Sequence, residues 1–346
     1  MRKLLFAILI LSMVIVPVMA EDITAPPAPD EAEIYMPDEP QTFSNGLLYI
    51  IRKAIGAVEP EFAEAGRLCS CVVAVVVLCI ITQHFSEHTK SVSDLVSTIL
   101  IASLLLLPTN ALIGLGRETI ENLSAYGKLF VPVITTSLAA QGAVTTSAAL
   151  YGATTAFLSI LNSLVSNLIV PLLYIYVAIA IVNSVLADDS LKRLRDFAKW
   201  ITVWSLKAVM YCYTAYMTIT GVVSGSVDAS ALKATKLAIS SAVPVIGSLL
   251  SDASETILVG AGIMKSSVGI YGLFVIISLF IGPFLKIGVQ YLLLKLTAAV
   301  TGIFASKQTV ELLNDFSGAM GMLLSMIGVQ TLLLIVSTVC FMRGVI

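Results

Sequence analysis

The stretch Val170–Trp200, VPLLYIYVAIAIVNSVLADDSLKRLRDFAKW, contains the pattern that decides the fold. Its apolar run from Pro171 to Ala187 is long enough to cross a hydrocarbon core of about 30 Å as a helix. The segment that follows, Asp188–Lys199, is the densest basic cluster of the chain, and Trp200 opens the next apolar run. Basic clusters beside spans stay in the cytoplasm, and indoles favour the membrane interface. The stretch therefore predicts a span, a short cytoplasmic surface helix and a second span.

The composition extends this interpretation to the whole chain. Of its 346 residues, 58% are hydrophobic and only 12% are charged, and the mean hydropathy is +0.96. Soluble proteins have about 45–50% apolar and about 25% charged residues. We therefore expect an all-α polytopic membrane protein whose surroundings are the lipid bilayer. The net charge of −2 provides no basic surface for nucleic acid, so no nucleic-acid partner is expected.

The N-terminal region has the layout of an exported protein. Residues 1–20 combine a basic start, an apolar centre and a small-residue end, Val18-Met19-Ala20, which is typical of a cleaved signal peptide. Residues 21–42 are rich in Pro, Asp and Glu, and predict a disordered extracytoplasmic linker. Cleavage of the signal would leave the new N-terminus outside the cytoplasm.

Residues 43–116 form the next predicted unit. Phe43–Arg67 has apolar residues at helical spacing with charges between them, which indicates an amphipathic helix on the outer surface. Leu68–Phe85 and Asp94–Gly114 are the first two predicted spans. The short connection between these spans carries Lys90, as expected of a cytoplasmic loop.

The remainder of the chain is predicted to contain an internal duplication, with a first unit at 117–223 and a second at 224–346. Three ordered matches support it: Val131-Pro132-Val133-Ile134 with Val243-Pro244-Val245-Ile246, Pro171 with Pro283, and Leu194-Arg195-Asp196-Phe197 with Leu313-Asn314-Asp315-Phe316. Each unit is interpreted as a broken or re-entrant helical hairpin, a proline-interrupted span, a surface helix and a closing span. In the first unit the break of the hairpin is expected at Gln141-Gly142. This gives six or seven transmembrane helices. If Tyr271–Phe304 crosses once the repeats are parallel, and if it crosses twice they are inverted.

Candidate functional residues lie in Ser224–Leu258, the longest semi-polar interval of the C-terminal two-thirds. Asp252 and Glu255 are an acidic pair that the first unit lacks, and they are candidate contacts for a partner or an ion. An alternative is that Ser251 and Asp252 cap a helix. Pro132, Pro171 and Pro283 are interpreted as hairpin prolines with an architectural role.

No motif in the chain predicts catalysis, a cofactor or a metal. The string His84-Phe85-Ser86-Glu87-His88 matches the inverted zinc-protease motif H-x-x-E-H, but it lies in a short loop at the end of a span. A polar helix end that leaves the membrane is the preferred interpretation. We therefore predict that the protein is not an enzyme and that it has no catalytic, cofactor-binding or metal site.

The interval around Pro244 resembles the central signature of the stage III sporulation protein AE family. The residues that carry the resemblance are Val227-Asp228, Ala231-Leu232-Lys233, Ala238-Ile239-Ser240, Val243-Pro244-Val245-Ile246-Gly247, Leu250-Ser251-Asp252-Ala253 and Thr256. Asp228, Pro244 and Gly247 thereby join the candidate contacts. The layout of a signal peptide, an acidic linker and a multi-span body is similar as well.

The resemblance implies a multi-pass protein of the mother-cell membrane that faces the engulfed forespore. Its expected role is that of a permease-like or scaffolding core in a channel or secretion complex, with no enzymatic activity. The implied partners are other stage III sporulation membrane proteins and, through them, a forespore membrane protein. Two alternatives remain from the residues alone: a stand-alone secondary transporter built from duplicated broken helices, and an intramembrane metalloprotease that uses His84 and His88.

Overall fold

The computed structural model describes residues 25–37, 43–85, 90–140, 144–186, 189–219 and 267–343. These residues form helices joined by short connections, and no strand occurs among them. The all-α prediction is therefore confirmed for this part of the chain. Five of its helical segments are long and apolar enough to cross a membrane: 43–82, 92–136, 151–186, 268–301 and 307–341.

The N-terminal segment folds onto the helical body. Helix α2 (Asp30–Glu33) places Ala32 in the core, and the Ala28 N–H donates to the Tyr271 hydroxyl at 3.2 Å. The prediction of a disordered linker is thus wrong for residues 25–37. The physical reason is that Ala32 and Met36, although few, are both buried against the body.

Helices α3 (Phe43–Ala57) and α4 (Glu59–Phe85) follow each other almost in line. Pro60 explains the interruption at Val58, because proline lacks an N–H and disfavours the helical turn before it. The apolar stripe of α3 packs on helix α11 (Ser267–Thr301), where the rings of Phe43 and Phe274 stack at 5.8 Å. The helix predicted over Phe43–Arg67 is divided at Val58: α3 ends at Ala57, and the remainder belongs to α4. Ile50 and Ala54 are buried in the bundle, whereas Leu48 and Ile55 are exposed.

Helix α5 (Lys90–Ala140) is unbroken over 51 residues, although it contains Pro108 and Pro132. The predicted boundary at 116/117 falls inside it. The helix continues because its buried side chains keep helical spacing on both sides of that point, while Arg117 and Glu121 form an ion pair on the outer face at 2.8 Å. The predicted hairpin near Gln141-Gly142 joins two long helices, so it is not a short re-entrant loop.

The next hairpin consists of α6 (Val144–Leu164), the π-helical segment η2 (Val165–Ile169), α7 (Val170–Leu186) and α8 (Asp189–Ile219). The π turn directly precedes Pro171, and the Val170 N–H bonds to the Val165 carbonyl. A π turn is a common adjustment of a helix around a local defect. Helix α8 unites the predicted surface helix and the predicted span that begins at Trp200.

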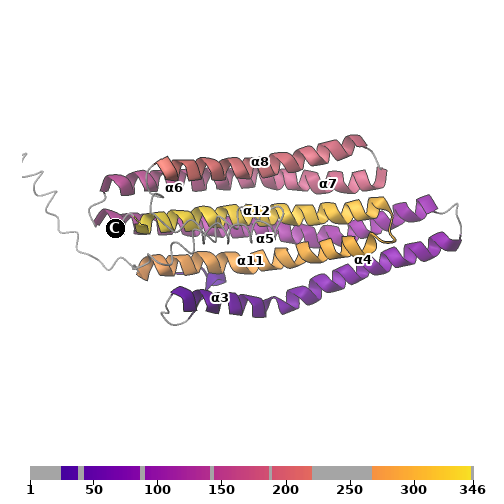
Figure 1. The fold of residues 1–346 in the computed structure, drawn as a ribbon, viewed down its shortest axis with the longest axis horizontal. Coiled ribbons are helices and arrows are strands. Elements are labelled where there is room, and N and C mark those ends of the chain that lie inside the picture. Colours follow the sequence, from indigo (N-terminus) through magenta and orange to yellow (C-terminus); the bar gives the residue numbers. More distant parts are fainter. Residues whose placement is uncertain are drawn as a thin grey trace, which may run out of the picture.

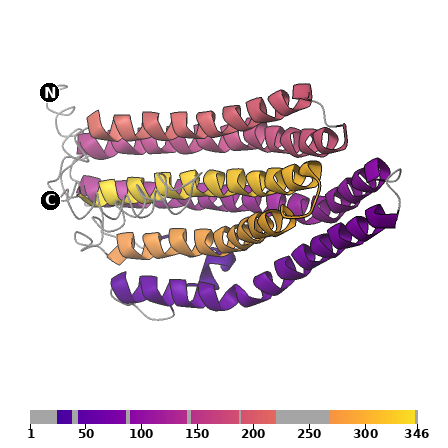
Figure 2. The same cartoon turned by 45° about the vertical axis from the view of Figure 1, so that its right-hand side comes forward.

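Helices α11 and α12 (Lys307–Arg343) form the last hairpin. Helix α11 is continuous through Pro283, so Tyr271–Phe304 traverses the bundle once. In Figures 1 and 2 the ends of α4, α7 and α11 and the starts of α5, α8 and α12 lie at one end of the bundle, which we call the turn end. The start of α3 and the end of α12 lie at the opposite end. The hairpins α7–α8 and α11–α12 therefore run in the same direction, as parallel repeats require.

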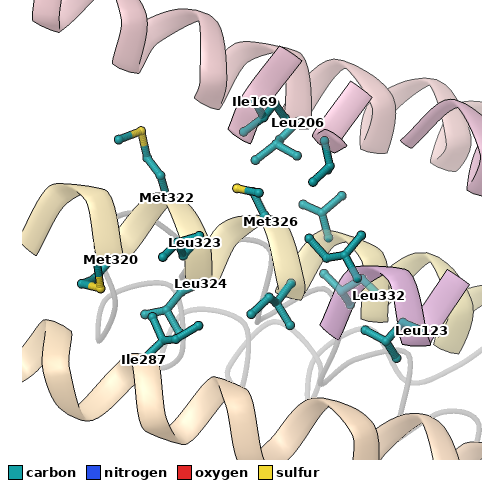
Figure 3. Packing of buried hydrophobic residues seen from close by; sticks show 14 of the residues in the cluster. Leu123, Ile169, Leu206, Ile287, Met320, Met322, Leu323, Leu324, Met326 and Leu332 are labelled. Atoms are coloured by element: carbon teal, nitrogen blue, oxygen red, sulfur yellow. The ribbon is translucent and has the colours of Figure 1, made fainter. Parts of the chain in front are cut away.

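Helix α12 is the centre of the bundle. In its most apolar window 94% of the residues are buried, and it packs against α5, α6, α7, α8 and α11. Figure 3 shows Leu323 and Met326 of α12 between Ile169 and Leu206 on one side and Ile287 on the other. Large aliphatic side chains therefore fill the axis of the described bundle.

Candidate functional site: two polar clusters in the helix bundle

The predicted contacts divide into two groups in the structure. Five of them lie outside the described residues: Asp228, Pro244, Gly247, Asp252 and Glu255. The prolines Pro132, Pro171 and Pro283 lie inside helices and are not brought together at one site. Two clusters of described polar residues are candidate sites instead, one beside Pro283 and one near the turn end.

The cluster beside Pro283 surrounds a cavity of about 320 Å³ between α2, α3, α4, α5 and α11. Proline 283 has no N–H, so the carbonyl of Leu279, one helical turn earlier, lacks its intrahelical donor. Both residues line the cavity, as does Ser278. The Ser278 Oγ is buried and has no hydrogen-bond partner among the described residues.

A charged pair lies at the edge of this cavity. The Lys286 ammonium of α11 donates to the Glu61 carboxylate of α4 at 2.9 Å, and their side chains are 41% and 27% exposed. Tyr35 reaches the same place because Gly282 has no side chain: a Cβ there would lie 2.8 Å from the Tyr35 hydroxyl. Burial, followed by the charge of Glu61, raises the pKa of Tyr35, so its hydroxyl stays protonated.

The second cluster joins α7, α8 and α12 near the turn end. Arg195 Nη1 donates to Asp315 Oδ2 at 2.6 Å, and the two side chains are only 8% and 10% exposed. The Tyr176 hydroxyl donates to the other oxygen of Asp315 at 3.2 Å. Arg195 also contacts Asp196 at 3.0 Å, but that carboxylate is 60% exposed.

Further polar contacts surround the buried pair. Lys192 contacts Glu311 at 3.2 Å, and the Lys295 ammonium donates to the Asn314 amide oxygen at 2.9 Å. These contacts connect α8 and α11 to the first turns of α12. The predicted internal repeat matches the motif that contains Arg195 with the motif that contains Asp315. Nothing in the two motifs indicates that these side chains form an ion pair.

Neither cluster contains a set of metal ligands. In the described part of the chain, no three His, Cys, Asp or Glu residues lie close enough to hold a metal ion. His88 lies outside that part, and nothing is described of the His84 side chain. A cavity with a half-exposed ion pair is suited to binding, and a buried ion pair between three helices is suited to holding their relative positions.

Comparison with known proteins identifies relatives of the whole helical body. The curated protein "Stage III sporulation protein AE" of Bacillus subtilis (strain 168) is 21% identical over 245 residues, which cover 69% of this chain and 61% of that protein. No solved structure matches the chain. The sequence profile described as "Stage III sporulation protein AE" matches residues 41–344, nearly the entire body, and the chain therefore belongs to the stage III sporulation protein AE family.

Proposed function

We propose that this protein is a non-enzymatic, multi-pass membrane subunit of the stage III sporulation complex that links the mother cell and the forespore. The observation that carries the proposal is the family match over residues 41–344, which includes every long helix described above. Family membership gives the sporulation role. The geometry of the bundle supports the finer points that follow.

The exposed apolar side chains support a membrane position at the turn end. On α5 they are dense from Val92 to Leu107, a length of about 24 Å at 1.5 Å per residue, close to the hydrocarbon thickness. Helices α4, α7 and α11, which also reach the turn end, expose further apolar residues: Val77, Leu78, Ile81, Ile175, Val182, Leu186, Leu292, Leu296 and Val300. Leu48, Leu129 and Ile160 are exposed apolar residues outside this set. The other half of α5 exposes Arg117, Glu118, Glu121 and Lys128. Helix α5 would measure about 77 Å in all, so this half extends beyond the bilayer.

A membrane position at the turn end also supports an orientation of the protein across the membrane. Lys192, Arg193 and Lys199 lie near the turn end, and basic residues beside spans remain in the cytoplasm. The opposite end, with the start of α3 and the end of α12, would then face the space between the two membranes. This orientation agrees with an exported N-terminus after signal cleavage.

The filled axis of the bundle supports a scaffolding or channel-wall role. A conduit through the centre of one chain would have to pass the buried side chains around α12 (Figure 3). A channel is better explained if this protein assembles with other stage III membrane proteins and, through them, with a forespore membrane protein. The alternative of a stand-alone transporter requires discontinuous helices. Helices α5 and α11 are instead continuous through their prolines.

Genetics and topology mapping test the proposal together. Deletion of the gene in its own host is expected to abolish heat-resistant spores, and the tagged protein is expected to co-purify with other stage III proteins. With the native cysteines replaced and the protein expressed in non-sporulating cells, where the same face meets the medium, Asn45→Cys is expected to react with a membrane-impermeant maleimide in intact cells. Ile303→Cys at the turn end is expected to react only after lysis. Normal sporulation after deletion would contradict the proposed role, and the reverse labelling pattern would contradict the orientation.

A further inference from the structure

We propose that the cavity beside Pro283 binds an organic cation with a primary ammonium group on a short aliphatic chain. The cavity, about 320 Å³, is within the size range of small-molecule sites. It lies between the bundle helices and the N-terminal segment, which contributes Glu31 and Tyr35 to its lining. This inference does not depend on the role proposed above.

The charge of the lining favours a cation. Three carboxylates line the cavity, those of Glu31, Glu61 and Glu118, against the single ammonium of Lys286. Because Lys286 is paired with Glu61, two negative charges remain that form no ion pair with the described residues. Glu31 and Glu118 are both exposed, so a ligand can reach them from solvent. A ligand with two positive charges would compensate this excess.

The cavity also presents oxygen acceptors that lack donors. The Ser278 Oγ is only 1% exposed, lines the cavity and has no partner among the described residues. The Leu279 carbonyl loses its helical donor because of Pro283. A buried polar atom without a partner destabilises the protein, so a bound donor would be favourable here. An ammonium group has three donors and no acceptor.

The remaining walls distinguish an organic cation from a metal ion. Ala54, Ala57, Val58 and Leu115 line the cavity and offer apolar contact to an aliphatic chain. In the described chain, no group of three acidic, histidine or cysteine residues has the arrangement of a metal site. The required ligand therefore combines an ammonium head with an apolar stem. A free diamine and a lysine side chain of a partner protein share this chemistry.

Binding is tested with the full chain in nanodiscs of uncharged lipid. We expect 1,4-diaminobutane, at constant ionic strength, to raise the melting temperature saturably and to give a calorimetric isotherm. N-acetyl-lysine amide is the second probe: tighter binding of the diamine indicates a free cation, and tighter binding of the lysine derivative indicates a partner's lysine. If NaCl raised the melting temperature as much as both amine probes do, the proposal would be overturned.

Variants make the test specific to the cavity. Glu118→Gln is expected to weaken diamine binding about five- to tenfold, because it removes one of the two uncompensated charges. Glu64→Gln on α4, which does not line the cavity, is the matched control and should leave binding unchanged.

Two further substitutions separate binding from folding. Ser278→Ala removes an unpaired buried oxygen, and Pro283→Ala returns an N–H to the Leu279 carbonyl. Both are expected to weaken diamine binding severalfold while raising the melting temperature of the unliganded protein. Unchanged diamine affinity in Glu118→Gln, Ser278→Ala and Pro283→Ala alike would refute the site.

Discussion

Replacement of Asp315 by alanine should be among the most damaging single changes in the bundle. It removes the carboxylate that Arg195 contacts at 2.6 Å, and it leaves a guanidinium that is only 8% exposed without this partner. Loss of one member of a buried pair typically costs about 3–5 kcal/mol. Arg195 keeps its contact with Asp196, so we expect the lower end, about 3 kcal/mol. By the scaling of soluble domains to a chain of this length, this corresponds to a fall in Tm of roughly 4–6 °C.

The measurement is thermal unfolding in detergent, followed by tryptophan fluorescence. The chain has two tryptophans, Trp200 and Trp204, and both lie on α8, the helix that carries Arg195. Asp196→Ala is the matched control. It removes the other, exposed carboxylate and is expected to cost less than about 1 kcal/mol.

A double variant distinguishes the removal of both charges of the ion pair from the removal of one charge. Arg195→Met combined with Asp315→Leu removes both charges and fills the space with apolar atoms. Such replacements are often neutral, so stability should return to within about 1 kcal/mol of the parent. The reasoning is refuted if Asp315→Ala is no more harmful than Asp196→Ala. It is also refuted if the double variant loses the sum of its two single changes.

Other predictions concern helix α11. Gly272→Ala should destabilise the protein by about 1–3 kcal/mol, since the new Cβ would overlap the buried ring of Phe130, whereas Gly288→Ala, which has open space, should stabilise it by about 0.5–1 kcal/mol. Thermal unfolding of the two variants checks this, and equal effects would contradict the packing. Lys286→Met should cost only about 0.5–1 kcal/mol, because its ion pair with Glu61 is partly exposed, and a loss as large as that of Asp315→Ala would contradict this assignment.

Much of the fold could be predicted from local sequence. Apolar runs and their polar borders located the long helices, and the break near Gln141-Gly142 lies between α5 and α6. The predictions that were based on prolines were wrong. Pro132 and Pro283 predict broken helices, but each lies in a continuous helix. Neighbouring helices provide the packing that keeps such a helix intact, and a local pattern contains no information about those neighbours.

The side-chain pairs of the two candidate sites could not be predicted from local sequence. Lys286 and its partner Glu61 are 225 residues apart in the chain, and no local pattern links them. Arg195 and Asp315 were noticed only as parts of a repeated motif. Matching residues of the repeat also differ in burial: Phe197 is exposed on α8, whereas Phe316, its counterpart on α12, is buried.

The sequence by itself therefore determined the class of the protein, its helical segments and its family, because hydrophobic length and composition act locally along the chain. The tertiary structure was needed to show that α12 lies at the centre, that the N-terminal segment lines a cavity, and that Arg195 contacts Asp315. These features depend on which helix faces which. That choice is made by packing and by charge pairing between residues far apart in the chain.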